Sequence, residues 1–234
     1  MESARVGQRV VVAVDGPSGS GKSSTARGVA TRLGLRYLDT GALYRAVTWS
    51  MLQRSVDVHD AAAVAEAVSS IDVTLSTDPA DPRVGVDGRD VSDEIRERDV
   101  TNAVSAVSAV PEVRRALVPV QRRIIDAGGV VVEGRDIGSV VAPDATVKVF
   151  LTADSRERAQ RRSAELEHDQ EVTVELTLDE LRRRDHLDSS REVSPLVRAD
   201  DALVLDSTDL TLDQVIDAIV ALVEPHLSSV PGRG

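Results

Sequence analysis

Several residue types that often carry chemistry are scarce in this chain of 234 residues. It contains no cysteine, which excludes disulfides, thiolate metal ligands and a cysteine nucleophile. With only four histidines, a histidine-rich metal site is not expected. No apolar run is long enough to cross a bilayer, so we expect no membrane partner. The N-terminal residues Met1 to Arg5 lack the apolar core of a signal peptide, and we expect a cytoplasmic protein.

Lysine is also nearly absent, although the chain is rich in charge. Of its 28 basic residues only Lys22 and Lys148 are lysine, and the net charge is -11. An acidic protein repels DNA and RNA unless its positive charge is concentrated locally, so we expect no nucleic-acid partner. We expect a monomer that acts on small molecules.

A glycine-rich loop follows the first predicted strand, a β-branched run from Arg9 to Val14. The loop Gly16-Pro17-Ser18-Gly19-Ser20-Gly21-Lys22-Ser23 fits the pattern G-x-x-x-x-G-K-[ST] and opens a helix predicted over 22–33. Glycines let the backbone wrap around phosphate oxygens, and the helix N-terminus adds positive potential. We expect Lys22 to bridge the β- and γ-phosphates of a nucleoside triphosphate and Ser23 to ligate Mg2+. The alternative is a glycine turn that binds nothing.

Strands alternate with helices along most of the chain, which favours a parallel, doubly wound sheet. Short apolar runs predict further strands at 35–38, 130–132, 146–151 and 202–205. Helices are predicted from Thr40, as the capping residue, to Leu52, and over 94–110, 111–127, 155–167, 178–188 and 212–227. We predict one three-layer α/β/α unit with a core at 5–56 and 99–227, a helical lid at about 153–172 and a disordered tail from Ser228.

Residues 57–98 differ from this pattern and predict a small inserted lobe. Asp60 to Ser70 is rich in alanine and predicts a helix. Two short strands are predicted at 71–76 and 84–86, and Asp87-Gly88 after the second is a hairpin signal.

The kind of phosphate-loop protein depends on other motifs. A guanine-binding switch protein needs an Asn/Thr-Lys-x-Asp motif, but Lys148 is followed by Val149-Phe150. A motor ATPase usually has a strand that ends in a metal-binding carboxylate. The run Val130-Val131-Val132-Glu133 is the nearest candidate, and it keeps that alternative open.

Arginines gather at the ends of predicted elements and in charged helices. In the segment 155–162, Arg158 and Arg162 lie four residues apart on one helical face, with Arg161 beside them. Phosphoryl transfer needs such cations because its transition state spreads charge over the phosphoryl oxygens. A lid that closes over the nucleotide would bring these arginines to its phosphates. The alternative is a solvated helix in which they pair with Glu165 and Glu167.

Several motifs together resemble those of bacterial cytidylate kinases, in the same order and over nearly the whole chain. The motifs are the phosphate loop from Asp15 to Ser23, Leu38-Asp39-Thr40-Gly41-Ala42-Leu43-Tyr44-Arg45, Glu133-Gly134-Arg135-Asp136-Ile137-Gly138, Arg184-Asp185-His186-Leu187-Asp188-Ser189-Ser190-Arg191, Pro195-Leu196 and Ala202-Leu203-Val204-Leu205-Asp206-Ser207-Thr208. The inserted lobe also fits this family. One departure is Ser23-Ser24, where relatives often have glycine and threonine, but Ser23 keeps the hydroxyl.

The resemblance implies transfer of the ATP γ-phosphate to CMP or dCMP, with Mg2+. It implies that the loop residues Gly16, Pro17, Ser18, Gly19, Ser20, Gly21, Lys22, Ser23 and Ser24 bind ATP, with Ser23 on the metal. It implies an acceptor site made of Thr40, Tyr44, Arg45, Ser105, Arg114, Arg135, Asp136, Arg184, Asp188 and Arg191. Ser105, Arg114 and Asp136 would read the cytosine, Arg45 and Arg135 would hold the acceptor phosphate, and Arg184 and Asp188 would hold the sugar. Lys22, Arg135, Arg158 and Arg191 are the expected catalytic cations.

Each of these residues also has a plain structural interpretation. Tyr44 could belong to the core, Asp136 could cap a turn or bind a metal, and Arg114 could lie on the surface. Asp188 and Arg191 could form an ordinary helix surface pair. Asp15 is expected to order the loop or the water shell of the metal. The alternative functions are another small-molecule kinase, for UMP or a non-nucleotide acceptor, and an ATP-switched regulatory module.

Overall fold

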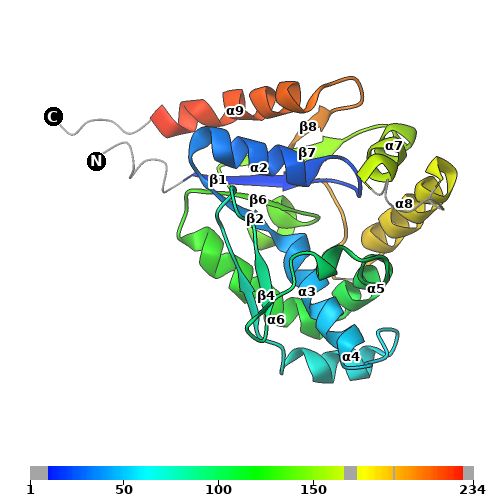
Figure 1. Cartoon of the computed structure of the whole chain (residues 1–234). Helices are drawn as coiled ribbons and strands as arrows, with labels where there is room; N and C mark the ends of the chain where they lie inside the picture. The colour runs from blue at the N-terminus through cyan, green and yellow to red at the C-terminus, as the bar shows by residue number, and fades with distance from the viewer. Residues whose placement is uncertain (1–9, 166–172, 192, 229–234) are drawn as a thin grey trace.

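A five-stranded parallel sheet forms the centre of the protein (Figure 1). The computed structural model describes residues 10–165, 173–191 and 193–228. The strand order is β2-β6-β1-β7-β8, and every neighbouring pair is parallel. The strands are β1 (Val11–Asp15), β2 (Arg36–Asp39), β6 (Val130–Gly134), β7 (Val147–Thr152) and β8 (Leu203–Asp206). The predicted parallel sheet is confirmed, with strand bounds shifted by one or two residues.

Helices cover both faces of this sheet, which confirms the three-layer prediction. Val12 and Val14 of β1 pack in one cluster with α2 (Lys22–Leu33) and α9 (Leu212–Ser228), the two helices above the sheet in Figure 1. Ala13 points to the opposite face, where its cluster includes Ile125 of α6 (Pro111–Asp126) and Ile137 of a π-helix (Ile137–Val141). Alternation of side chains along a strand produces this division.

The strand register brings three carboxylates to the same edge of the sheet. Asp15 ends β1 opposite Gly134, and Asp39 ends β2 opposite Glu133. Ligands of open parallel sheets bind at the carboxyl ends of the strands. The loops that follow β1, β2 and β6 at this edge are the ones that carry the motifs found in the sequence.

The inserted segment forms a helix and a separate antiparallel sheet. The elements are α4 (Ala61–Val68), β3 (Val73–Leu75), β4 (Val84–Val86) and β5 (Arg89–Asp90). Asp87 and Gly88 have φ angles of 51° and 81°, which suits the tight hairpin that the sequence predicts. Val84 and Val86 bury their side chains against Ala46 and Trp49 of α3 (Thr40–Gln53), so the lobe packs on a helix of the core.

Two helix predictions are wrong in detail. Thr40 does not cap α3; Asp39 does, and its carboxylate accepts from the Ala42 N–H at 2.8 Å. The predicted helix over 94–110 is broken at Glu97 into a 3-10 turn (Glu94–Arg96) and α5 (Arg98–Ala109). Ile95 and Val100 would point about 140° apart on a continuous helix. Both are buried in one cluster, and the break allows that.

Two helices lie beside the phosphate loop, α7 (Ser155–Glu165) and α8 (Val174–Ser189). Thr173 caps α8, which begins four residues before its predicted start. The predicted end of the first helix at Glu167, part of the predicted lid and the tail after Ser228 lie outside the described residues. Within the described part of the chain, no helix is long and apolar enough to cross a membrane.

Candidate active site

The phosphate loop joins β1 to α2 through conformations that require glycine. Gly19 and Gly21 have φ angles of 74° and 84°. A Cβ on Gly16 would lie 2.0 Å from the Leu151 carbonyl oxygen, because the loop crosses directly over β7. The loop is therefore held in place by the neighbouring strand and by its own backbone.

Lys22 is the buried cation of this loop. Its Nζ donates to the Pro17 carbonyl at 2.7 Å and to the Ser20 hydroxyl at 3.4 Å. Burial, and after it the guanidinium of Arg135, lowers the pKa of Lys22 to about 7. Polyphosphate oxygens beside Nζ would favour the charged form and raise the pKa again. The loop thus contains a buried cation whose hydrogen-bond partners, a carbonyl and a hydroxyl, carry no negative charge.

A carboxylate and a hydroxyl meet where a metal ion bound to phosphates would lie. Ser23 is exposed at the start of α2, and its hydroxyl hydrogen-bonds to the Glu133 carboxylate. Tyr37 also donates to Glu133, at 2.9 Å. Burial, and after it the charge of Asp39, raises the pKa of Glu133. One hydroxyl and nearby carboxylates fit Mg2+, which keeps several waters and takes its remaining ligands from phosphates. No cluster of three acidic or histidine residues that could hold a metal alone occurs among the described residues.

Asp15 fastens the loop to the strand beside it. Its carboxylate accepts from the backbone N–H groups of Ile137 and Gly138, at 2.9 and 2.7 Å. Burial raises the pKa of Asp15 to about 6, and these two hydrogen bonds oppose that shift without cancelling it. Asp15 therefore orders the junction between the phosphate loop and the segment after Asp136, as the first of its two expected roles.

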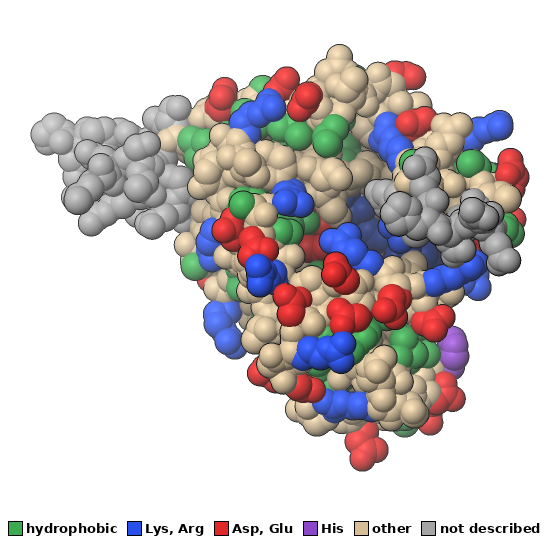
Figure 2. All heavy atoms as spheres, viewed as in Figure 1, with side chains coloured by type: hydrophobic (Ala, Val, Ile, Leu, Met, Phe, Trp, Pro, Cys, Tyr) green, Lys and Arg blue, Asp and Glu red, His purple; other side chains and the backbone are tan. Residues whose placement is uncertain are grey.

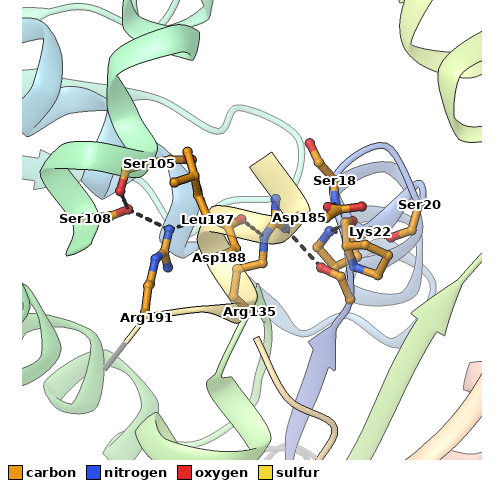
Figure 3. A network of polar contacts seen from close by, with 12 residues as sticks. Ser18, Ser20, Lys22, Ser105, Ser108, Arg135, Asp185, Leu187, Asp188 and Arg191 are labelled. Atoms are coloured by element: carbon orange, nitrogen blue, oxygen red, sulfur yellow. Dashed lines mark hydrogen bonds and ion pairs between the residues drawn. The ribbon is translucent and has the colours of Figure 1, made fainter. Parts of the chain in front are cut away.

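Asp188 is the centre of a second group of charges, on α8 (Figure 3). Its Oδ2 accepts from Arg135 Nε at 2.8 Å, and its Oδ1 accepts from Ser105 Oγ at 3.3 Å and from Arg191. Burial alone would raise the pKa of Asp188, but the guanidinium groups of Arg135 and Arg191 hold it below its ordinary value. The pair of Asp188 and Arg191 is thus buried, and Asp188 also binds residues of two other segments. It is not an ordinary helix surface pair.

Arg135 connects the charged group around Asp188 with the phosphate loop. While its Nε binds Asp188, its Nη1 donates to the Gly16 carbonyl oxygen at 3.1 Å. Figure 3 shows Arg135 between Asp188 and the phosphate loop. The expected acceptor-site cation therefore contacts the donor loop directly.

Arg114 and Asp136 form a buried ion pair next to Tyr44. The Arg114 guanidinium lies 5.5 Å from the centre of the Tyr44 ring. Burial raises the pKa of Asp136, and the charge of Arg114 opposes this shift. Tyr44 also packs in the core between α3, α5 and α6, so its structural interpretation is correct as well. Arg114 is not a surface residue.

The residues at the start of α3 are engaged with the sheet edge. Thr40 Oγ1 donates to the Glu133 carbonyl at 2.7 Å, and Arg45 pairs with Asp39 at 3.0 Å. Arg184 is half-buried on α8, and burial, followed by the charge of Arg135, lowers its pKa to about 10. All the acceptor residues named from the sequence thus lie around one region, at the carboxyl edge of the sheet.

Five arginines of this region have an unused donor. Each Nε atom in this set is buried and has no hydrogen-bond partner among the described residues: Arg45, Arg114, Arg158, Arg184 and Arg191. Buried donors without partners are rare in proteins, and one explanation is a ligand that supplies the acceptor. In Figure 2, basic side chains lie in a hollow near the centre of the molecule. The set of donors therefore fits an anionic ligand.

A separate cavity of about 560 Å³ lies between α2, α9 and the inserted lobe. Ser23 and Ser24 line one end of it, and Arg27, Arg83 and Ile95 line the rest together with other residues. None of the expected acceptor residues lines this cavity. The cavity therefore lies apart from the expected acceptor residues.

Sequence reasoning missed the roles of two carboxylates of the site, Asp185 and Asp39. Asp185 accepts from the Ser18 N–H and pairs with Arg158, and Asp39 holds Arg45. The spacing of Asp185 three residues before Asp188 was an available signal, because residues three apart share a helical face. Arg161, expected at the nucleotide phosphates, donates to the Ser207 carbonyl and pairs with Glu157.

The fold and the phosphate loop define a nucleotide-binding protein of the P-loop class. The family model described as cytidylate kinase matches residues 12–225. The chain therefore belongs to the cytidylate kinase family. It is 53% identical to a cytidylate kinase of Streptomyces griseus, over 96% of each chain. It is 51% identical to one of Streptomyces avermitilis, over 95% of this chain and 96% of that protein, and 52% identical to one of Rhodococcus opacus, over 92% and 94%.

A solved structure shares the fold at low sequence identity. It is an uncharacterized protein from Eubacterium ventriosum, with a TM-score of 0.51 and 12% identity, covering 93% of this chain and 99% of that one. At this identity the likeness concerns the fold alone.

Proposed function

We propose that this protein transfers the γ-phosphate of ATP to CMP or dCMP, giving ADP and CDP or dCDP. The observation that carries the proposal is the set of buried arginine donors without partners beside a phosphate loop. A kinase with two phosphorylated substrates needs cations for both. The relatives above are named cytidylate kinases, which selects CMP among the phosphorylated acceptors.

The donor side would be formed by Gly16 to Ser24. Backbone N–H groups of the loop would hold the phosphates, and Lys22 would bridge the β- and γ-phosphates. Mg2+ would neutralise charge that develops on the phosphate oxygens. Ser23 would hold the ion, and the Glu133 carboxylate orients this hydroxyl through its hydrogen bond.

The acceptor side would be formed by side chains from five elements. Asp136 and Arg114, with Ser105, would read the cytosine edge, because cytosine offers an amino donor where uracil offers an acceptor. Arg45 and Arg135 would hold the acceptor phosphate, and Thr40 and Tyr44 would line the site. Arg184 and Asp188 would hold the sugar. The burial of the Arg114–Asp136 pair supports a recognition role, because water does not compete there.

The chemistry needs positions and charges more than proton transfer. An oxygen of the CMP phosphate would attack the γ-phosphorus of ATP, and the bond from that phosphorus to the β-phosphate oxygen would break. The attacking oxygen is already anionic near neutral pH, so no general base is required. Lys22, Arg135, Arg158 and Arg191 would stabilise the charge of the transition state. No covalent intermediate with the protein is formed.

A coupled assay that follows ADP tests the proposal. The full chain is given ATP and Mg2+ with CMP, dCMP, UMP, AMP, GMP or TMP in turn. We expect CMP and dCMP to give the highest kcat/KM. The proposal fails if they are no better than AMP, GMP or TMP. ADP formation that no monophosphate stimulates would favour the ATP-switched module instead.

The proposal also includes the location of the protein, its oligomeric state, and the roles of the inserted lobe and the lid. The protein would act as a cytoplasmic monomer on small molecules, and its acidic net charge argues against nucleic-acid substrates. The inserted lobe at about 57–98 would bind the acceptor monophosphate, and the predicted lid at about 153–172 would close over the donor. The packing of Val84 and Val86 on α3 supports the first assignment, because it links the lobe to Tyr44 and Arg45 of the same helix.

A further inference from the structure

The backbone of Ser18 in the phosphate loop is held by charged side chains at both its N–H and its carbonyl oxygen. Its N–H donates to Asp185 Oδ1 at 3.0 Å, and its carbonyl oxygen accepts from Arg158 Nη1 at 2.9 Å. Arg158 Nη1 also donates to Asp185 Oδ2, at 2.6 Å. The three groups form a closed ring of hydrogen bonds that joins the loop to α7 and α8.

Close packing surrounds this ring. A Cβ on Gly19 would lie 3.0 Å from the Arg158 carbonyl oxygen and 3.5 Å from Leu181 Cδ1. Leu181 is buried and lies four residues before Asp185 on α8, on the same face. The Asp185 side chain is 20% exposed and that of Arg158 is 9% exposed, so water screens the pair only weakly.

The same helix face continues into the charged residues of the expected acceptor site, which we call the acceptor group. Its members are Asp39, Arg45, Arg114, Arg135, Asp136, Asp188 and Arg191. Asp188, three residues after Asp185, accepts from Arg135 and Ser105. Figure 3 shows Asp185 directed toward Ser18 and Asp188 directed toward the arginines. One rigid helix therefore contacts the donor loop and the acceptor group within a single turn.

We propose that Asp185 is a positioning residue for phosphoryl transfer. Its carboxylate holds the Arg158 guanidinium at the rim of the phosphate loop and sets the Ser18 peptide, and through α8 it sets the distance between this loop and Asp188. The unpartnered Nε of Arg158 lies on the guanidinium that Asp185 anchors. The proposal rests on the proposed function, because Arg158 is taken to act on the transferred phosphoryl group.

A double-mutant cycle tests this role. Asp185→Asn keeps the shape and an acceptor for the Ser18 N–H but removes the charge that anchors Arg158, and Arg158→Met removes the partner. We expect Asp185→Asn to lower kcat about 10- to 100-fold, as for other supporting groups, with KM for CMP changed less than threefold. The double variant should lose no more than the more severe single variant. Asp179→Asn is the matched control on α8, since Asp179 is exposed and its one ion pair among the described residues is with Arg182 at 3.8 Å.

Two results would overturn the proposal: an unchanged kcat in Asp185→Asn, whether or not its melting temperature falls, and additive losses in the cycle. Calorimetric titration with MgATP separates this test from the proposed function. If the wild-type protein transfers phosphate to no monophosphate, the function fails. In that case Asp185→Asn should still lower the affinity for MgATP about 10-fold, because Asp185 also holds the phosphate loop. An unchanged affinity would show that Asp185 does not support MgATP binding by the loop either.

Discussion

The donor loop and the acceptor group hold their cations in different ways. Lys22 in the loop is held by a backbone carbonyl five residues away, that of Pro17. The acceptor arginines are held by carboxylates instead. Two of these pairs join distant segments, Arg114 with Asp136 and Arg135 with Asp188, and two are local, Arg191 with Asp188 and Arg45 with Asp39. A local loop can be ordered by its own backbone, whereas a site assembled from distant segments uses ion pairs to position its arginines.

This difference has an electrostatic consequence. The loop cation has no carboxylate within hydrogen-bonding distance among the described residues, and its pKa is lowered to about 7. In the acceptor group each carboxylate offsets a guanidinium, and Arg45, Arg114 and Arg191 keep unused Nε donors. The loop therefore favours a highly charged polyphosphate, while the acceptor group suits a singly phosphorylated molecule that shares arginines with carboxylates.

Replacing the loop lysine is expected to have the largest effect. Lys22 is buried between Pro17 and Ser20, and a planar guanidinium does not fit the space of a compact ammonium. Lys22→Arg should lower kcat/KM for ATP about 10³-fold or more, which corresponds to about 4 kcal/mol. Steady-state kinetics with saturating CMP measures this loss.

The other lysine provides the control for that experiment. Lys148 on β7 pairs with the exposed Asp201, away from the loop. Lys148→Arg should stay within about threefold of the wild-type kcat/KM. Equal effects of the two substitutions would contradict the special role of the loop lysine and remove the distinction between the two regions.

On the acceptor side, removing the central carboxylate should cost stability as well as binding. Asp188→Asn removes the charge that pairs with both Arg135 and Arg191. We expect the free energy of unfolding to fall by about 3 kcal/mol and KM for CMP to rise more than KM for ATP. Urea denaturation and steady-state kinetics measure the two effects, with Asp179→Asn as the control. Unchanged stability would mean that the ion pairs do not hold this region together.

The same contrast explains what the sequence could predict. The phosphate loop is recognised from a pattern of eight consecutive residues, and the helix after it was predicted to its last residue, Leu33. Two ion pairs of the acceptor group, Arg114–Asp136 and Arg135–Asp188, join residues 22 and 53 positions apart, and no local pattern says which carboxylate meets which arginine there. The resemblance to a family named these residues, but it did not give their partners.

Other differences from prediction also come from contacts made at a distance. The break at Glu97 follows from the need to bury Ile95 and Val100 in one cluster, which depends on where α3 lies. The π-helix after Asp136 donates two hydrogen bonds to Asp15, a residue 122 positions from Ile137. Helical periodicity and turn residues carry no information on such contacts.

Asp15 lies at the junction of the two regions and predicts a pH effect. The folded protein keeps the Asp15 proton up to about pH 6, whereas an unfolded carboxyl group loses it near pH 3.8. Between these values folding takes up a proton, so the stability from this group is full below about pH 4 and is lost as the pH rises through 6. The shift corresponds to about 3 kcal/mol.

Comparison with Asp15→Asn isolates this effect, because the other titrating groups are common to both proteins. Urea denaturation at pH 4 and pH 7 should show the wild type losing about 3 kcal/mol more than the variant. Parallel losses in the two proteins would show that Asp15 is ionised throughout, held by the N–H groups of Ile137 and Gly138.

The smallest expected effect concerns the choice of acceptor. Asp136→Asn keeps a side chain of the same shape beside Arg114 but removes the acceptor pair that would bind the cytosine amino group. We expect the preference for CMP over UMP in kcat/KM to fall about 10-fold, because one misread base edge costs about 1 to 3 kcal/mol. MgATP affinity, measured by calorimetry, should change less than threefold, since Asp136 makes no hydrogen bond to the phosphate loop among the described contacts. Unchanged selectivity would remove Asp136 from base recognition. A loss of ATP affinity equal to the loss of selectivity would show that the two regions are not separable at this residue.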